Sequence, residues 1–252
     1  MPAGRLYLVP TPLDFGCEPQ VPLADVLPAG TIAVAARLTR WVGENAKSAR
    51  AFLKRVGEVQ PLAAPLQQQQ ILELPREVHK KGDHVAGFDA KPLLQSLGVG
   101  EDIGLLSEAG MPAVADPGSS VVRAAHELGL EVVPLVGPVS LLLALAASGL
   151  NGQNFAFVGY LPQDAAQRTQ RLRELEALAA RTGQTQLFIE TPYRNMALWQ
   201  AMLQALKPAT RIAVASGLTL PSARCRSANA SGWKQQSPPV GNDIPAVFAI
   251  GI

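Results

Sequence analysis

Two carboxylates, two glycines and two prolines follow a short apolar run within the segment Ile103–Gly118. The run Ile103–Leu106 predicts a buried strand, and after it stands Ser107-Glu-Ala-Gly-Met-Pro-Ala-Val-Ala-Asp-Pro-Gly118. Small residues let a backbone approach a ligand closely, and a carboxylate can accept hydrogen bonds from ribose hydroxyls or offset a positive charge. The segment fits a ligand-binding loop, and it fits equally a plain strand–loop–helix connection in which Asp116 caps the next helix.

A second segment of this kind is Leu135–Ser140, at the end of a strand predicted over Glu131–Val136. In an open parallel sheet, ligands bind beyond the carboxyl ends of the strands. Gly137 and the backbone of Val139–Ser140 could therefore line the same crevice. Taken alone, the segment is more simply a helix entry with Ser140 near the start of the helix.

Polar residues also gather between Arg37 and Arg50, after an apolar run over Thr31–Ala35 that predicts a buried strand. Basic side chains and a tryptophan there suit an anionic substrate such as RNA or a polycarboxylate. The alternative is a solvated helix face capped by Glu44 or Asn45. A further polar cluster, Glu190-Thr-Pro-Tyr-Arg-Asn195, follows the predicted strand Gln186–Ile189.

Composition limits the classes of protein to which the chain can belong. Almost half of the 252 residues are apolar, enough for a sizeable core, and the net charge of +2 indicates no large nucleic-acid-binding field. Two distant cysteines and three scattered histidines show no metal-ligand spacing, so we expect no metal and a reducing compartment. No signal peptide is visible, and the longest apolar run, Leu141–Ala147, is too short to span a bilayer. These features predict a cytoplasmic protein.

Several well-known motifs are missing. The sequence has no Gly-x-x-x-x-Gly-Lys-Ser/Thr loop, no Gly-x-Ser-x-Gly elbow and no Gly-x-Gly-x-x-Gly after the first strand, where Pro10-Thr-Pro-Leu-Asp14 stands. These absences weaken nucleotide triphosphatase, hydrolase and nicotinamide oxidoreductase interpretations.

The elements that must position these residues alternate between strand and helix, which predicts an α/β fold with a mostly parallel amino-terminal sheet. The carboxyl-terminal half has less regular connections and predicts a mixed sheet. Two helix-breaking residues, Gly137 and Pro138, place the domain boundary, giving domains 1–137 and 138–252. The remaining predicted strands are Leu6–Val9, Phe155–Val158, Arg211–Ala215 and Ala246–Ile250, and the predicted helices are Ala46–Val56, Ser119–Leu128, Ser140–Ser148, Ala165–Arg181 and Asn195–Leu206.

With these motifs in order, the sequence resembles the tetrapyrrole methylase superfamily, the class III S-adenosylmethionine methyltransferases. The branch related to the ribosomal small-subunit RNA ribose 2′-O-methyltransferase is especially similar. The matching motifs are Ser107-Glu-Ala-Gly-Met-Pro112 with Asp116-Pro-Gly118, Val136-Gly-Pro-Val-Ser140, Gly159-Tyr-Leu-Pro162, Phe188-Ile-Glu-Thr-Pro-Tyr-Arg194 and Gly217-Leu-Thr-Leu220. Each motif is weak alone, but five in order over nearly the whole chain are specific.

The resemblance implies a two-domain methyltransferase, commonly a homodimer, with S-adenosylmethionine in the cleft between the domains. The amino-terminal domain would form the substrate side and part of the cofactor site, and the carboxyl-terminal domain the rest. Cofactor contacts are then expected from Pro10, Ser107, Glu108, Ala109, Asp116, Val139, Ser140, Ile189, Leu218 and Ala246. As carboxylates that could act as a base we name Glu44 and Glu190, and as substrate-binding residues Arg37, Arg40, Tyr193 and Arg194.

The segments expected to form the substrate side differ from the motifs of the ribosomal RNA methyltransferase branch. Pro10-Thr-Pro-Leu-Asp-Phe-Gly16 lacks the Gly-Asn of the family's first loop, and Ala36-Arg-Leu-Thr-Arg40 replaces its Glu-Asp-Thr-Arg. The methyl donor is therefore better supported than the acceptor. RNA, most simply ribosomal RNA, is the leading acceptor; a tetrapyrrole is the first alternative, and a protein that binds the cofactor without transferring the methyl group is the second.

Overall fold

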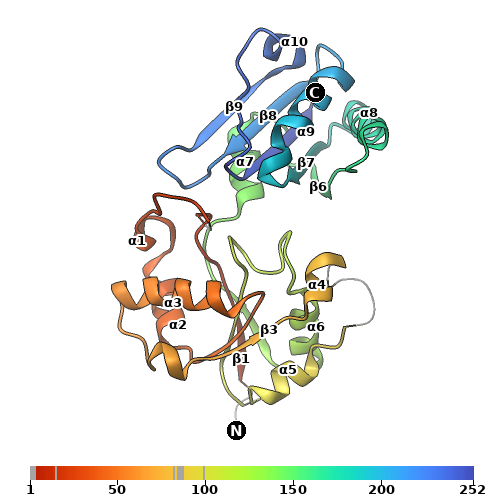
Figure 1. The fold of residues 1–252 in the computed structure, drawn as a ribbon. Helices are drawn as coiled ribbons and strands as arrows, with labels where there is room; N and C mark the ends of the chain where they lie inside the picture. The colour runs from red at the N-terminus through yellow and green to blue at the C-terminus, as the bar shows by residue number, and fades with distance from the viewer. Residues whose placement is uncertain (1–3, 15, 82, 84–87, 99) are drawn as a thin grey trace. The chain divides into compact units, whose positions relative to one another are not determined.

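The computed structural model divides the chain into two compact units, each built on its own five-stranded sheet (Figure 1). The first unit comprises Met1–Gly16 and Gln20–Val139, and the second Cys17–Pro19 and Ser140–Ile252. The residues that the structure describes are 4–14, 16–81, 83, 88–98 and 100–252.

The sheet of the first unit is parallel throughout, with strand order β3-β2-β4-β1-β5. Because all strands run in one direction, the loops that follow them emerge at one edge, which we call the carboxyl edge. The mostly parallel sheet expected for this half is confirmed. Its strands are β1 (Arg5–Val9), β2 (Arg40–Gly43), β3 (Gln70–Glu73), β4 (Ile103–Leu106) and β5 (Glu131–Pro134).

Helices lie on both faces of this sheet, as Figure 1 shows. Successive residues of β1 point to opposite faces: Leu6 joins the core beneath α5 and α6, whereas Tyr7 and Val9 join the core beneath α2 and α3. The first unit therefore has two apolar cores separated by the sheet. Its helices are α1 (Leu23–Val26), α2 (Ala29–Arg37), α3 (Ala46–Val59), α4 (Arg76–Lys81), α5 (Lys91–Ser96), α6 (Ser119–Glu127) and the 3-10 turn η1 (Leu66–Gln68).

One predicted strand is wrong. The run Thr31–Ala35 lies inside helix α2, where Ile32, Ala35 and Ala36 are buried at helical spacing. Helix α2 contains four alanines, which favour a helix, and a run of five residues is too short to show a period that separates the two structures. The second strand of the fold is instead β2, whose Trp41 is fully buried.

The second unit has a mixed sheet, as expected, with strand order β6-β7-β10-β8-β9. Only β6 and β7 pair in parallel; β10 runs antiparallel to β7 and β8, and β9 antiparallel to β8. Strand β9 was not predicted, because its side chains are mostly polar and exposed. The strands are β6 (Phe155–Tyr160), β7 (Thr185–Glu190), β8 (Arg211–Ser216), β9 (Arg224–Asn229) and β10 (Ala246–Gly251).

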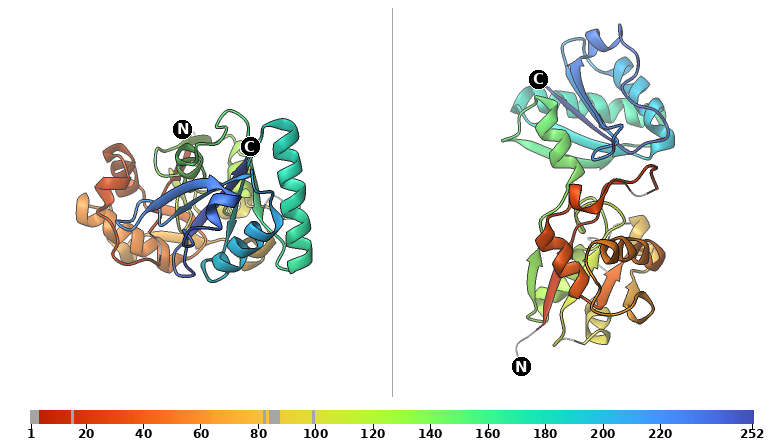
Figure 2. Two further views of the ribbon diagram at one scale, coloured as in Figure 1. Left: turned by 90° about the horizontal axis from the view of Figure 1, so that it is seen from above. Right: turned by 90° about the vertical axis from the view of Figure 1, so that its left-hand side faces the viewer.

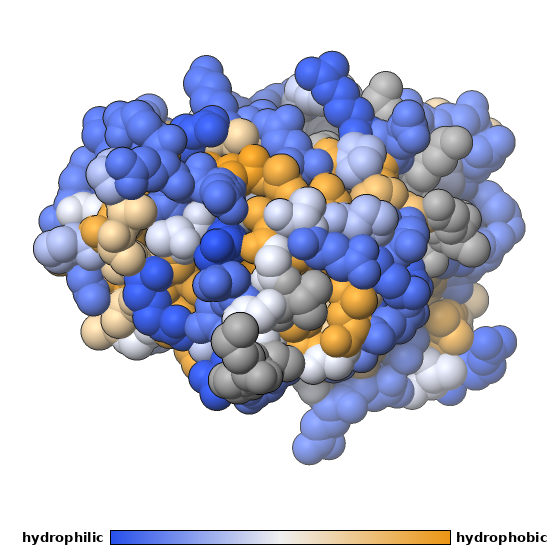
Figure 3. All heavy atoms as spheres, turned by 90° about the horizontal axis from the view of Figure 1, so that it is seen from below, coloured by the Kyte–Doolittle hydropathy of each residue, from blue (hydrophilic) through white to orange (hydrophobic). Residues whose placement is uncertain are grey.

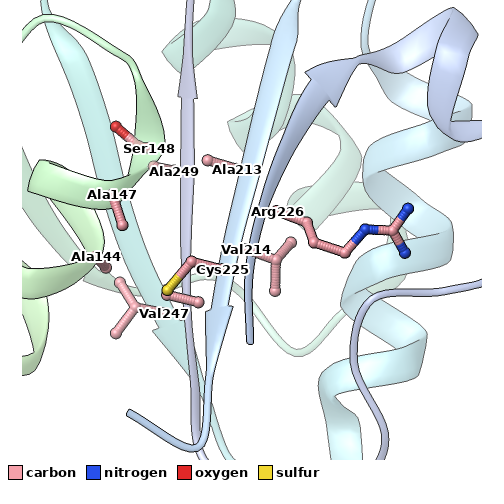
Figure 4. A pocket seen from close by; sticks show the side chains of 10 residues that line it. Ala144, Ala147, Ser148, Ala213, Val214, Cys225, Arg226, Val247 and Ala249 are labelled. Atoms are coloured by element: carbon pink, nitrogen blue, oxygen red, sulfur yellow. The ribbon is translucent and has the colours of Figure 1, made fainter. Parts of the chain in front are cut away.

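The two faces of the second sheet carry different side chains, large aromatic ones on one face and small ones on the other. Phe188, Phe248 and the edge-to-face pair Trp199–Trp233 fill the core beneath α8 and α9, and α8 is the long helix in Figure 2. The other face presents small residues such as Ala213 and Ala249 to Ala144 and Ala147 of α7, as Figure 4 shows. The helices are α7 (Ser140–Ser148), α8 (Ala165–Thr182), α9 (Asn195–Ala205), α10 (Ala230–Trp233) and the 3-10 turn η2 (Pro192–Arg194). In the part of the chain that the structure describes, none of the helices has the length and apolar character needed to cross a membrane.

Candidate functional site

The loops that follow β1 and β4 are joined at the carboxyl edge of the first unit. Thr11 and Gly110 exchange backbone N–H···O bonds of 2.9 and 3.1 Å, and the Thr11 hydroxyl donates to the Ser107 carbonyl at 3.2 Å. Gly137 lies against Pro10 so closely that a Cβ at this position would overlap the Pro10 ring. The segments containing Pro10, Ser107 and Gly137 therefore meet at one edge. Thr11, which joins two of them, was not among the residues predicted from the sequence.

The loop Ser107–Gly118 holds four residues in the left-handed region of φ. They are Gly110 (+83°), Ala113 (+64°), Ala115 (+66°) and Gly118 (+139°). A left-handed alanine costs about 1–2 kcal/mol, so the surrounding structure must hold this loop in place. Strain of this kind is concentrated at ligand-binding sites.

Asp83 supplies the cap that holds the end of this loop. Its Oδ2 accepts from the backbone N–H groups of Gly118 (2.7 Å) and Ser120 (2.8 Å) and from the Ser120 hydroxyl (2.8 Å). Its Oδ1 accepts from the Ser119 hydroxyl at 2.7 Å. Burial raises the pKa of Asp83, but these hydrogen bonds together hold it below its usual value. The suggestion that Asp116 caps α6 is wrong, because Asp83 does so from 35 residues upstream.

Three carboxylates gather around the loop. The backbone N–H of Glu108 donates to Glu44 Oε1 at 3.3 Å. Burial and the negative charges of Glu44 and Glu108 raise the pKa of Asp116 to about 7. A cationic ligand group would relieve this repulsion, so the carboxylates that the sequence analysis named separately form one acidic site.

A pocket of about 320 Å³ lies beside this acidic site, between the loop after β1 and helix α3. Thr11, Ser48, Phe52 and Glu108 line both this pocket and a smaller one that reaches Glu44 and Ser107. The ion pair between Asp14 and Arg55 (2.9 Å) fastens the loop to α3. Asn45, not Glu44, caps α3 by accepting from Lys47 N at 2.8 Å, which leaves Glu44 on the pocket side.

Asp116→Asn is expected to raise the free energy of unfolding at pH 8 by about 1–2 kcal/mol, after allowing for solvent screening of a half-buried group. The folded-state pKa of Asp116 is raised, so the wild type loses stability relative to the variant as the pH rises from about 4 to about 7. Below about pH 4 the two proteins should be equally stable. Urea unfolding at about pH 4, 6 and 8 measures the difference; a difference independent of pH would contradict the interaction.

Arg37 and Arg40 do not lie with the acidic site. Arg37 ends α2 and pairs with Asp102 (2.7 Å), and Arg40 begins β2 and pairs with Glu101 (2.9 Å), both at the amino ends of the strands. Figure 3 shows the molecule from below the view of Figure 1, where hydrophilic residues surround hydrophobic patches. The premise that these arginines follow a strand is wrong, because the predicted strand is α2. Their contact with RNA stays a prediction.

In the second unit, three predicted cofactor residues lie at one edge of the sheet. Ala246 begins β10 and pairs with Glu190 of β7 and Ser216 of β8, Ile189 is next to Glu190, and Leu218 follows β8. Gly217 N donates to Pro245 O at 3.0 Å, which fixes the Leu218 loop beside Ala246. Val139 ends the first unit and Ser140 begins α7, as the sequence indicated for the helix start.

Glu190 is buried and already engaged. Its Oε1 accepts from the Arg194 guanidinium at 2.7 and 3.0 Å and from the backbone and hydroxyl of Thr191 at 2.7 and 3.2 Å. The guanidinium carbon of Arg194 lies 5.2 Å from the ring centre of Tyr193, which is 68% exposed. The Glu190 carboxylate is therefore already engaged, whereas the exposed Tyr193 ring can stack on a planar ligand.

Among the residues that the structure describes, no group of three or more His, Cys, Asp or Glu side chains is arranged so that it could hold a metal ion. The donor set at the carboxyl edge, acidic groups around small residues, suits an organic cation. The groups that the site offers are therefore carboxylates, hydroxyls and backbone amides.

Comparison with known proteins identifies the fold family. The sequence model of the tetrapyrrole (corrin/porphyrin) methylases matches residues 33–231. The "Ribosomal RNA small subunit methyltransferase I" of Mesorhizobium japonicum is 32% identical over 85% of this chain, and that of Escherichia coli O157:H7 is 31% identical over 86%. The chain spans 63% and 66% of the lengths of these two relatives.

Solved structures share the architecture of both units. The methyltransferase CobJ superposes with a TM-score of 0.57 at 18% identity, covering 98% of this chain and 94% of that one. The uroporphyrin-III C-methyl transferase from Thermus thermophilus, solved with S-adenyl homocysteine, gives 0.53 at 17% identity, covering 98% and 97%. Because the sequence model matches most of the chain and the solved structures share its fold, the chain belongs to the tetrapyrrole (corrin/porphyrin) methylase family.

Proposed function

We propose that this chain is an S-adenosylmethionine-dependent methyltransferase whose acceptor is RNA, with small-subunit ribosomal RNA as the first acceptor to test. The acidic site around the loop Ser107–Gly118 carries the proposal, because three carboxylates and a raised Asp116 pKa favour a ligand that carries positive charge. The relatives named as ribosomal RNA methyltransferases support RNA as the acceptor. We also propose a homodimer in the cytoplasm, where ribosomal RNA lies.

The residues of each unit fit the cofactor in different ways. In the first unit, Pro10, Ser107–Ala109, Asp116 and Val139 would bind it by backbone contacts and by charge. Ser140, Ile189, Leu218 and Ala246 would bind it from the second unit. The first unit would also supply the substrate side. When bound, the cofactor supplies an electrophilic methyl group on a sulfonium.

The protein's own part is alignment and proton removal. A methyl group transfers in an in-line displacement, so the acceptor oxygen must be held opposite the leaving sulfur with water excluded. A ribose hydroxyl is a poor nucleophile and needs a base, for which Glu44 is placed beside the pocket at the carboxyl edge. Glu190 is the second candidate, although its Oε1 is already engaged by the Arg194 guanidinium. Tyr193, Arg194, Arg37 and Arg40 would contact the substrate.

Calorimetry with S-adenosylmethionine is expected to show one site with a Kd of about 1–100 μM, or about −5 to −8 kcal/mol. The wild type should then transfer a labelled methyl group to small-subunit RNA in a ribonuclease-sensitive product. The control is Glu127→Gln. Glu127 lies on α6 and forms an exposed ion pair with Lys91 of α5, so this variant should bind the cofactor and transfer the methyl group as the wild type does. No binding up to millimolar concentrations would refute the cofactor.

The choice of acceptor decides between the remaining functions. Label in uroporphyrinogen and none in RNA would replace the RNA proposal by a tetrapyrrole methyltransferase. Binding of the cofactor with no label in either acceptor would favour a protein that only senses it. Cofactor binding is measured before methyl transfer. A failure of the cofactor proposal can therefore be distinguished from a failure of the RNA proposal.

A further inference from the structure

Positive charge is unevenly distributed along the chain. Residues 1–139 contain twelve Lys and Arg against fifteen Asp and Glu, and residues 140–252 contain ten against five. The net charges are therefore −3 and +5, a contrast hidden by the total of +2. The second unit carries the excess of positive charge that a polyanion would need.

The two units also differ in how far their basic residues are paired. Five ion pairs bind basic residues of the first unit, those of Arg5, Arg37, Arg40, Arg55 and Lys91. Within the described part of residues 140–252 there are two, at Arg171 and Arg194. In residues 140–252, eight of the ten basic residues therefore lie outside any ion pair within the described part of the chain.

Two of these arginines stand together on β9, the last strand of its sheet. Arg224 and Arg226 are exposed, and they pair across the ladder with Ser216 and Val214. Two residues apart on a strand, they point to the same face at a separation of about 6.8 Å. Among the described residues, no ion pair includes either of them.

The Arg226 side chain is held in place by its surroundings. Its guanidinium carbon lies 4.9 Å from the ring centre of the buried Trp233, and it donates to Gln236. Figure 4 shows the Arg226 side chain extending on the opposite side of the sheet from Cys225 and α7. A guanidinium that is stacked and oriented loses less entropy when it binds a ligand.

A groove of about 310 Å³ continues this surface beside Arg224. Its lining residues include Ser216 and Ser222, Pro238 and Pro239, and one acid, Asp243. Among the described residues, no strand pairs with the outer side of β9, and backbone N–H groups on the open side of an edge strand can donate to a ligand. Hydroxyls, backbone N–H groups and arginine forks are the groups that contact phosphates in nucleic-acid complexes.

We propose that the outer edge of β9, with Arg224 and Arg226, binds the phosphate backbone of RNA and holds the substrate on the second unit. We call it the β9 surface. This inference rests on the proposed function and names the surface that its RNA substrate would use. RNA fits better than an acidic protein, because the planar guanidinium forks match phosphate oxygens in pairs and successive phosphates recur at a spacing close to that of the two side chains.

The test compares two double variants of the full chain that lose the same charge. Arg224→Gln/Arg226→Gln removes the β9 surface, and Arg171→Gln/Arg173→Gln removes two arginines from α8 in the same unit. Binding to small-subunit RNA is measured at several salt concentrations. The β9 variant should bind about 10-fold more weakly and lower the slope of log K against log[salt] by about 1–2, since each phosphate contact contributes about 0.7–0.9. The α8 variant should change the slope by less than half of that.

Equal losses in both variants would overturn the proposal, because net charge alone would then explain binding. An unchanged slope in the β9 variant would also overturn it. Polyglutamate serves as the probe for an acidic protein: if the β9 variant binds polyglutamate more weakly but binds RNA as the wild type does, the proposal is overturned as well. Calorimetry with S-adenosylmethionine checks that the variant is folded. If the wild type methylates RNA and the β9 variant keeps its slope, only this inference fails; if the wild type neither binds nor methylates RNA, the proposed function fails.

Discussion

Asp83→Ala is expected to lower the free energy of unfolding of the first unit by about 2–3 kcal/mol. The substitution removes four hydrogen bonds from a side chain that is 3% exposed, and leaves the N–H groups of Gly118 and Ser120 without their acceptor. It also removes a negative charge from the amino end of α6. Urea unfolding followed by circular dichroism measures the change.

The same substitution should weaken S-adenosylmethionine binding about 10-fold, because Asp83 holds the last residue of the strained loop Ser107–Gly118 in place. Asp89→Ala is the matched control, since Asp89 accepts from the N–H of Lys91, the first residue of α5, at 3.0 Å on an exposed site. It should lose about 0.5–1 kcal/mol and leave the affinity unchanged. Asp83→Asn keeps the acceptor oxygen and should recover most of the stability.

The pH dependence of this effect has a definite sign. The pKa of Asp83 is lowered in the folded state, so its stabilisation is present above about pH 4 and is lost as the pH falls through the folded-state pKa. Wild type and Asp83→Ala should therefore converge in acid. Stability that is lost without a change in cofactor affinity would show that Asp83 supports the fold but does not position the loop.

Much of the fold could be predicted because its signals are local. The buried run Ile103–Leu106 and the helix Ser140–Ser148 have the bounds that the sequence indicated, since both are marked by apolar pattern and flanking residues. The error at α2 has the opposite cause: a short alanine-rich run carries no period. Strand β9 escaped prediction because an edge strand with exposed arginines lacks the apolar pattern of a core strand.

The same distinction separates the parts of the site. The loop Ser107–Gly118 was predicted at a strand end because everything that defines it lies within 16 residues. Glu44 was placed at a strand end for a wrong reason, since the strand before it is β2 and not Thr31–Ala35. The cap from Asp83 joins residues that are 35 apart in the sequence, and no local sequence pattern predicts such a contact.

Glu44→Gln is expected to have the largest effect on the reaction, a fall in kcat of about 10²–10³-fold in methyl transfer to RNA. A glutamine has the same shape and can still accept from Glu108 N, so S-adenosylmethionine affinity should stay within about 3-fold of the wild type. Single-turnover methyl transfer over a range of pH measures the loss. In the wild type the rate should fall in acid as the base is protonated, and the variant should lack that dependence.

Glu190→Gln serves as the comparison, because it tests the other carboxylate. Its buried oxygen holds Arg194, so the substitution should lower stability by about 2–4 kcal/mol, while the rate of the folded fraction falls less than in Glu44→Gln. A larger rate loss at Glu190 would exchange the two roles.

A readout that needs no substrate separates a base from a merely structural Glu44. The negative charge of Glu44 helps to raise the pKa of Asp116, so Glu44→Gln should lower that pKa from about 7 in the free protein. If the pKa of Asp116 falls and the rate does not, Glu44 is close to the site but takes no proton, and the acceptor must then be nucleophilic enough to need no base. A tetrapyrrole carbon has that property and a ribose hydroxyl does not, so the rate of this one variant bears on the identity of the acceptor as well as on the role of Glu44.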